Sequence, residues 1–81
     1  VEQRLARTIV NLLHDFAVPH ADGYLLKIKL THQDFADLIA STRETVTATM
    51  TKWKHDDLVD MEERYLVIPD LTRLKQLGEI A

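Results

Sequence analysis

The sequence contains no cysteine among its 81 residues, so it can form neither a disulfide framework nor a thiolate metal site. Two glycines and two prolines leave no composition for a long flexible linker. Long hydrophobic runs are also missing, because uncharged stretches such as residues 8–13 are far shorter than the roughly 20 residues that span a bilayer. We therefore expect no membrane partner and a reducing, cytoplasmic location.

The sequence has no excess of basic residues, and its formal net charge is −3. Residues 1–30 hold four basic and three acidic side chains, residues 31–54 hold three of each, and residues 55–81 hold three basic and seven acidic ones. The acidity, which argues weakly against a nucleic-acid partner, is thus confined to the last third. The balanced remainder can still present a basic face, since the local field depends on where the charges lie.

Short periodic segments occupy most of the chain. Apolar residues at helical spacing predict an α-helix over about residues 2–16. Pro19 and Gly23 are typical of a loop over residues 18–23, and the alternating pattern of residues 24–30 predicts a short strand. The apolar positions of the first helix are Leu5, Ile9, Leu12, Leu13 and Phe16.

Two helix starts follow within about ten residues of each other. Thr31 with Asp34 forms one N-cap signal, and S-T-R-E at residues 41–44 forms the second. Two caps this close predict two short helices joined by a tight turn, the first ending near Ala40. Its buried side is predicted to consist of Phe35, Ala36, Leu38 and Ile39.

Residues 45–51 fit two interpretations. Their alternation and their β-branched side chains favour a strand by propensity, but helical spacing fits as well. The cap before them and the K-W-K-H sequence after them favour a helix, which would depend on tertiary packing for its stability. The helical interpretation places one stripe against the core, formed by Val46, Thr49, Met50 and Trp53.

The last third predicts a hairpin and a helix. Residues 58–61 and 65–68 form two short strands, and Asp70 caps an amphipathic helix that stops at Gly78. We therefore predict a single domain over residues 1–81 that is mainly α with a small β component. Its fold is a winged helix-turn-helix: a three-helix core with the motif at about 32–51, a β-hairpin wing at about 58–68 and an extra C-terminal helix.

The segment D-F-A-D-L-I-A-S-T-R-E-T-V-T at residues 34–47 resembles the helix-turn-helix of the cyclic AMP receptor protein and fumarate-nitrate regulator family. Further likeness lies in R-L-A at residues 4–6 and in R-Y-L-V-I-P-D at residues 64–70. The resemblance implies sequence-specific binding to double-stranded DNA, with the helix of residues 43–55 in the major groove of a palindromic operator. Half-sites would then lie about 34 Å apart.

The resemblance also implies a longer, cytoplasmic transcription regulator. Because a helical pattern starts at once from Val1, we expect a fragment that lacks an N-terminal effector-binding domain and forms a homodimer through it. This domain itself is expected to hold no cofactor, and the effector is unknown. Activation by contact between the loop at residues 19–23 and RNA polymerase is a further implication. The alternative is a winged-helix module that binds proteins and not specific DNA.

Three residues are candidates for reading bases. Arg43 stands where a guanidinium can meet the two acceptors of guanine, although a solvated arginine at a helix start is the simpler alternative. Glu44 could accept from the amino group of cytosine, as the resemblance implies, or could return to the Ser41 amide as a capping box. Thr47 lies one turn beyond Arg43 and could touch a base or a thymine methyl group.

Six residues are candidates for phosphate contacts. The resemblance implies this role for Thr31, Gln33, Thr42 and Thr45, and hydroxyl and amide groups at helix starts suit phosphate oxygens. Thr31 and Thr42 could also serve only as caps. Lys52 and Lys54 could neutralise backbone charge near the end of the helix, or could be solvated lysines at its C-terminus.

No chemistry of an enzyme is apparent in the sequence. Each of the four histidines lies within two residues of an acid, but nothing in their spacing makes them converge on a metal ion. No nucleotide-binding loop or nucleophile motif occurs. We expect no catalytic residue and no metal site.

The sequence departs from the family pattern at several positions. Ala48 stands where a second arginine is usual, so the preferred half-site should differ. Ala40 replaces the glycine common at the turn, at a backbone cost if φ is positive there. Asp57 replaces a glycine that is usual before the Leu-Val strand. The acidic wing should repel phosphate, which leaves Arg64 as its only expected DNA contact. Its acidic residues are Asp60, Glu62 and Glu63.

Overall fold

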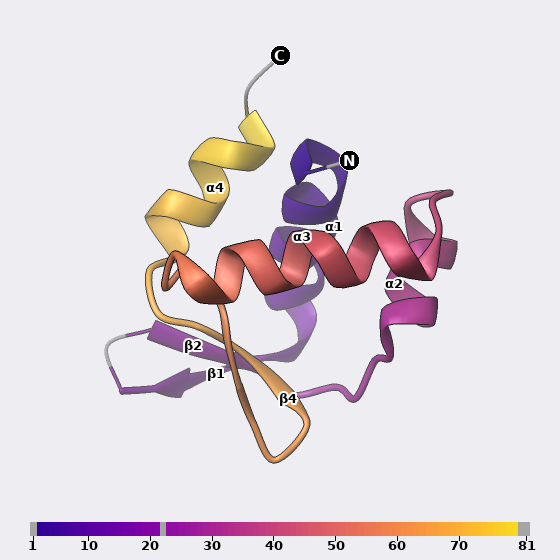
Figure 1. Cartoon of the computed structure of the whole chain (residues 1–81). Coiled ribbons are helices and arrows are strands. Elements are labelled where there is room, and N and C mark those ends of the chain that lie inside the picture. The colour runs from indigo at the N-terminus through magenta and orange to yellow at the C-terminus, as the bar shows by residue number, and fades with distance from the viewer. Residues whose placement is uncertain (1, 22, 80–81) are drawn as a thin grey trace.

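The computed structural model describes residues 2–21 and 23–79. Along the chain lie α1 (Glu2–Phe16), β1 (Ala17–His20), β2 (Gly23–Leu26), α2 (His32–Leu38), α3 (Arg43–His55), β3 (Asp60–Glu62), β4 (Tyr65–Ile68) and α4 (Leu71–Glu79) (Figure 1). This confirms the predicted fold class, a mainly helical winged helix-turn-helix with a small antiparallel sheet.

The sheet has the order β1-β2-β4-β3, and all of its neighbouring strands are antiparallel. The prediction for the first edge of the sheet was wrong, because residues 17–20 form a strand and not a loop. The next strand ends at Leu26, before the predicted end at residue 30. Pro19 is compatible with this strand because β1 lies at an edge of the sheet. A turn stops β2, since the amide of Ile28 donates to the carbonyl of Leu26 at 2.8 Å.

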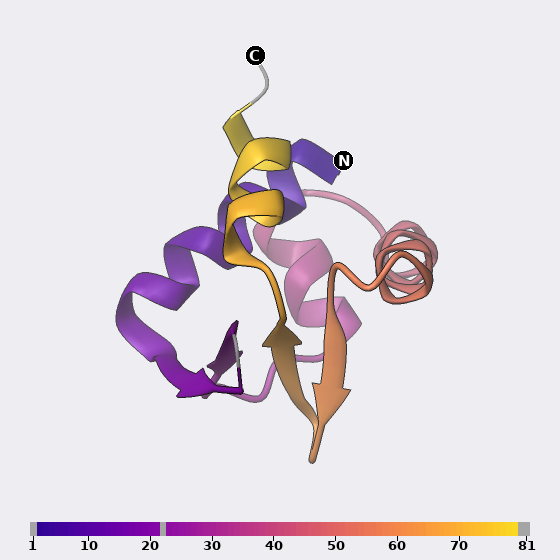
Figure 2. The ribbon, with the colours of Figure 1, turned by 90° about the vertical axis from the view of Figure 1, so that its left-hand side faces the viewer.

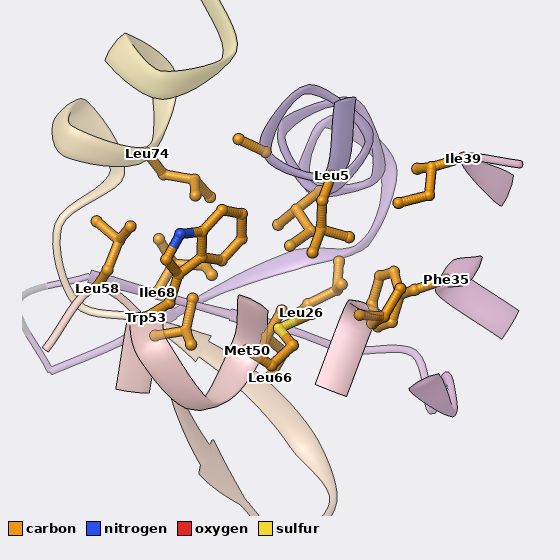
Figure 3. Packing of buried hydrophobic residues seen from close by; sticks show 14 of the residues in the cluster. Leu5, Leu26, Phe35, Ile39, Met50, Trp53, Leu58, Leu66, Ile68 and Leu74 are labelled. Carbon is orange, nitrogen blue, oxygen red and sulfur yellow. The ribbon is translucent and has the colours of Figure 1, made fainter. Parts of the chain in front are cut away.

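The core lies between the four helices and the inner face of the sheet (Figure 3). Trp53 is 1% exposed and is a core residue, as predicted, and residues 45–51 are helical within α3. Two predicted core positions were wrong: Leu38 is 57% exposed and Phe16 is 38% exposed. Leu38 lies about 160° around the helix from the buried Ala36, and Phe16 is the last residue of α1.

Both helices of the motif end with a residue in the left-handed conformation. Ala40 has φ 54° and Asp57 has φ 59°. The amide of Ser41 donates to the carbonyl of Ala36 at 2.9 Å, and that of Leu58 to the carbonyl of Trp53 at 2.8 Å. These bonds form Schellman motifs, in which glycine is the usual residue at the position held here by Ala40 and Asp57.

The wing is a tight hairpin. Glu63 and Arg64 both have positive φ, as a two-residue loop of type I′ requires. After the wing, Asp70 caps α4 as predicted, because its carboxylate accepts from the amides of Thr72 and Arg73. Gly78 is not the stop that was predicted, because it lies inside α4. Within residues 2–21 and 23–79, no helix combines the length and apolarity needed to cross a membrane.

Candidate nucleic-acid interface

The start of α2 is fixed by its own side chains. The hydroxyl of Thr31 accepts from the amide of Asp34 at 3.1 Å, and the carboxylate of Asp34 accepts from the amide of Thr31 at 2.9 Å. This is the reciprocal capping box expected from the sequence. It defines where α2 begins, and with it the position of His32, the first residue of the helix.

Helix α3 begins at Arg43, as predicted, and its cap decides between the two cap residues left open by the sequence. Its N-cap is Thr42 and not Ser41: the Thr42 hydroxyl accepts from the amide of Thr45 at 3.2 Å. Glu44 therefore lies in the first turn and does not close a capping box on Ser41. Its carboxylate is 3.7 Å from the guanidinium of Arg43, and the two side chains are 77% and 63% exposed. A pair this exposed contributes about 0–1 kcal/mol, so both groups remain available to a ligand.

One face of α3 packs on the core and the other faces outward. Val46, Thr49, Met50 and Trp53 are buried. Arg43, Glu44, Thr47 and Thr51 are exposed on the outer face. The structure thus places the three predicted base-reading residues on the exposed part of one helix. Figure 2 shows this helix end-on, next to the hairpin of β3 and β4.

Thr47 has a partner that sequence reasoning missed. Its Oγ1 lies 2.7 Å from Nδ1 of His32, at the start of α2. Fifteen residues separate the two. No local pattern signals such a contact, because it depends on the angle between α2 and α3.

The four predicted phosphate-binding residues at helix starts lie where they were expected. Thr31, Gln33 and Thr42 are exposed, and Thr45 is half-buried. The hydroxyl of Thr42 donates to Oγ1 of Thr45 at 2.9 Å, and the side-chain amide of Gln33 donates to the carboxylate of Asp37 at 2.9 Å.

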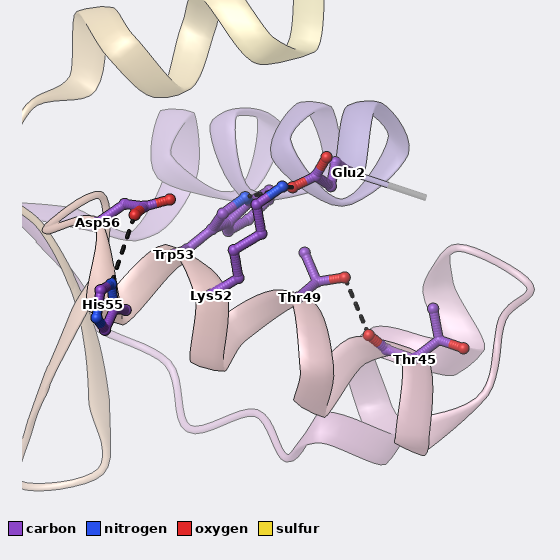
Figure 4. A network of polar contacts seen from close by, with 7 residues as sticks. All are labelled: Glu2, Thr45, Thr49, Lys52, Trp53, His55 and Asp56. Atoms are coloured by element: carbon purple, nitrogen blue, oxygen red, sulfur yellow. Dashed lines mark hydrogen bonds and ion pairs between the residues drawn. The ribbon is translucent and has the colours of Figure 1, made fainter.

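Lys52 is not brought to the same face. Its Nζ lies 3.1 Å from Oε1 of Glu2, and the same oxygen accepts from the indole N–H of Trp53 at 3.2 Å (Figure 4). Nine residues at 100° each place Lys52 about 180° around the helix from Arg43. By the same count Lys54 lies about 20° from Arg43, so it is the lysine on the side of the predicted base-reading residues.

The surroundings of the wing contain more basic side chains than the wing's own sequence indicates. A ring nitrogen of His20, in β1, lies 2.6 Å from the carboxylate of Glu62, one of the three acids of the wing. On the other side, the ammonium groups of Lys27 and Lys29 lie 4.5 Å and 5.5 Å from the centre of the Tyr65 ring. A cavity of about 220 Å³ separates the wing from α3, and Lys54 and Arg64 are among its lining residues. These lysines and Arg64 were not predicted to lie together around the wing, because only the fold brings them close to one another.

Among the residues that the structure describes, no three histidine, aspartate or glutamate side chains gather as a metal site would require. The pair His55 and Asp56, 3.7 Å apart, stands at the exposed end of α3. What the arrangement offers is an exposed polar face on one helix, two capped helix starts and nearby cations. Such a surface can bind a polyanion with base edges.

The comparisons with known proteins agree with this geometry. The model of the Crp-like helix-turn-helix domain matches residues 3–77. Global nitrogen regulators of Nostoc and Synechocystis are 34% and 32% identical over 65 and 73 residues, or 80% and 90% of the chain. The chain spans only 29% and 32% of the length of these two regulators.

Solved structures show the same fold. A CRP/FNR-family transcriptional regulator from Thermus thermophilus has a TM-score of 0.85 at 26% identity, covering 99% of this chain and 41% of its own. The CO-dependent transcription factor CooA from Carboxydothermus hydrogenoformans has a TM-score of 0.87 at 25% identity, covering 96% of this chain and 36% of its own.

Proposed function

The chain belongs to the family of Crp-like helix-turn-helix domains and is a DNA-binding domain of a transcription regulator; on this premise we propose that α3 enters the major groove of a palindromic operator. The observation that carries the proposal is the exposed polar face of α3, whose opposite face is held by the core. A rigidly backed helix presents side chains to base edges in a fixed register.

Three side chains read bases in this proposal. The Arg43 guanidinium donates to O6 and N7 of a guanine, and the Glu44 carboxylate accepts from the N4 amino group of a cytosine. Thr47, one turn further, touches a base edge or a thymine methyl group. The 3.7 Å pair of Arg43 and Glu44 supports adjacent contacts, since the two groups already lie side by side.

Phosphate contacts fix the register. Thr31, Gln33, Thr42 and Thr45 surround the two helix starts, where amide dipoles favour an anion. Thr45 has a hydroxyl hydrogen available for a phosphate oxygen, because Thr42 donates to its oxygen. Lys52 reaches a phosphate only by leaving Glu2. Lys54 and Arg64, which line one cavity, support a cationic contact between α3 and the wing.

The remaining roles concern the whole regulator. We infer that residues 1–81 act as one domain within a longer cytoplasmic protein and bind DNA as a homodimer through segments outside these residues. Matches that cover only about a third of the relatives support this inference. The hairpin around residues 19–23 is proposed to contact RNA polymerase during activation, and no enzymatic reaction is proposed for the domain.

Two binding measurements test the proposal. Fluorescence anisotropy with a labelled random duplex should show affinity that falls by orders of magnitude between about 50 and 200 mM salt, because phosphate binding releases counterions. Selection from a random duplex library should then enrich one half-site. Binding to neither library would instead favour the protein-interaction module.

Arg43→Ala sharpens the test. On the selected site it should cost about 1–3 kcal/mol and relax the preference at one base pair. Arg4→Ala, an exposed arginine on α1, is the matched control and should leave the preference intact. Equal losses on every sequence would assign Arg43 to phosphate and remove it from base reading.

A further inference from the structure

We propose that His32 is a positioning residue for base specificity: it holds the side chain of Thr47 in one orientation and so sets the preference at the base pair that Thr47 faces. The inference rests on the proposed function, because it requires α3 to lie in the major groove. It assigns a role to a residue of α2, whose effect on base preference passes through the side chain of Thr47.

The supporting contact joins the two helices of the motif. Nδ1 of His32 lies 2.7 Å from Oγ1 of Thr47, a short hydrogen bond between exposed or half-buried groups. His32 stands directly after the capped Thr31, so its backbone is fixed by the capping box. The imidazole is therefore held on a fixed backbone beside Thr47, on the surface proposed to face the groove.

The other threonines of α3 show what Thr47 would do without this partner. Thr49 donates its hydroxyl to the carbonyl of Thr45 at 3.0 Å, and Thr51 donates to the carbonyl of Thr47 at 2.8 Å. Helical threonines commonly divide between two χ1 rotamers, of which one makes this backward bond. Thr47 instead has its oxygen on His32. A hydrogen bond to the imidazole therefore adds a preference for one χ1 rotamer to the preferences of the helix itself.

This choice decides what the DNA meets. A threonine side chain offers a hydroxyl on one side and a methyl group on the other, and a rotation about χ1 exchanges them. A hydroxyl suits an acceptor or amino group on a base edge, whereas a methyl group suits the thymine methyl. Fixing χ1 therefore restricts the tolerated base pair, and releasing it broadens the choice.

The test compares variants by competition binding on the selected half-site and on its three alternatives at each base pair. His32→Ala should reduce discrimination about three- to tenfold at one position only, the effect of losing one hydrogen bond. His32→Asn should restore it, since the asparagine amide places a polar atom near the former Nδ1. Gln33→Ala, the neighbouring position on α2, is the control and should weaken all sequences equally.

The combination with Thr47→Val identifies the route. If His32 acts through Thr47, adding His32→Ala to the valine variant should change discrimination no further. A uniform loss of affinity for His32→Ala, or a failure of His32→Asn to restore discrimination, overturns the inference while the proposed function stands. A wild-type chain that selects no sequence overturns the proposed function and the inference together.

Discussion

The guanidinium of Arg7 donates two hydrogen bonds to the carbonyl oxygen of Gly78, from Nε at 3.2 Å and from Nη2 at 3.0 Å. At the same point a Cβ on Gly78 would lie 3.2 Å from the backbone nitrogen of Arg7 and 3.3 Å from its Cα. The first and last helices therefore meet backbone to backbone, with Leu74 fully buried one turn earlier. In Figure 1 these two helices lie above the sheet, on the side away from the tip of the wing.

Gly78→Ala should lower the free energy of unfolding by about 1 kcal/mol. Alanine gains about 0.5–1 kcal/mol of helix propensity, but crowding a packed site costs about 1–3 kcal/mol. The crowded neighbour is backbone of α1, which yields less than a side chain, so crowding should prevail. Thermal unfolding measures the change. Gly78→Leu should be worse, and a stabilised alanine variant would mean that α4 shifts freely on α1.

Ala40→Gly should stabilise the domain by about 0.5–1 kcal/mol, because alanine at φ 54° carries a strain of about 1–2 kcal/mol that glycine's larger unfolded-state entropy only partly offsets. That is a rise in Tm of about 2–8 °C for a chain of this size. Asp57→Gly is the matched control at φ 59°. Aspartate tolerates this region better than alanine, so its gain should be smaller. Equal gains would show that residue type is unimportant at these caps.

The sequence predicted those features that depend on neighbours along the chain. The Thr31–Asp34 capping box, the helical spacing around Trp53 and the short distance between two caps were enough to place α2 and α3. Contacts between distant segments were not predictable. Strand β1 exists because it pairs with β2, and Gly78 is small because Arg7 lies beside it. The local roles predicted for them, a loop for the segment of β1 and a helix stop for Gly78, do not occur in the fold.

The site divides in the same way. Arg43, Glu44 and Thr47 lie close together in the sequence of α3, so predicting the helix was enough to expect them near one another on its exposed side. His32 was not selected, since its position depends on the packing of α2 against α3. Lys54 was considered only together with Lys52, because its place beside the wing depends on how the wing packs against α3. Lys52 was selected for its charge alone, and its pairing with Glu2 required knowing that α1 passes beside α3.

Glu2→Ala should destabilise the domain by about 1 kcal/mol, because it removes the acceptor of the Trp53 indole N–H, a largely buried donor. Glu2→Gln keeps an acceptor oxygen and loses only the charge opposite Lys52. That exposed pair contributes about 0–1 kcal/mol, so the glutamine variant should stay near wild type. Denaturation followed by the emission of the single tryptophan measures both. Equal losses would mean that the charge, and not the hydrogen bond to Trp53, is what stabilises this corner.

Glu44→Ala should change base preference without lowering thermal stability by more than about 0.5 kcal/mol, the usual range for a surface substitution that removes no cap. Thr42, and not Glu44, caps α3, and the Glu44 carboxylate is 77% exposed. Removing it should relax the requirement for a cytosine at one position of the selected half-site and leave the neighbouring positions unchanged. Selection from a random library, run beside a thermal melt, separates the two effects.

Glu63→Ala at the wing turn removes the same charge outside α3 and should raise affinity for every duplex alike. A Glu44→Ala variant that behaves like Glu63→Ala would show that the carboxylate acts only as a repulsive charge near the backbone. A variant that loses about 1 kcal/mol of stability with unaltered preference would instead restore the capping role that the position of Thr42 argues against.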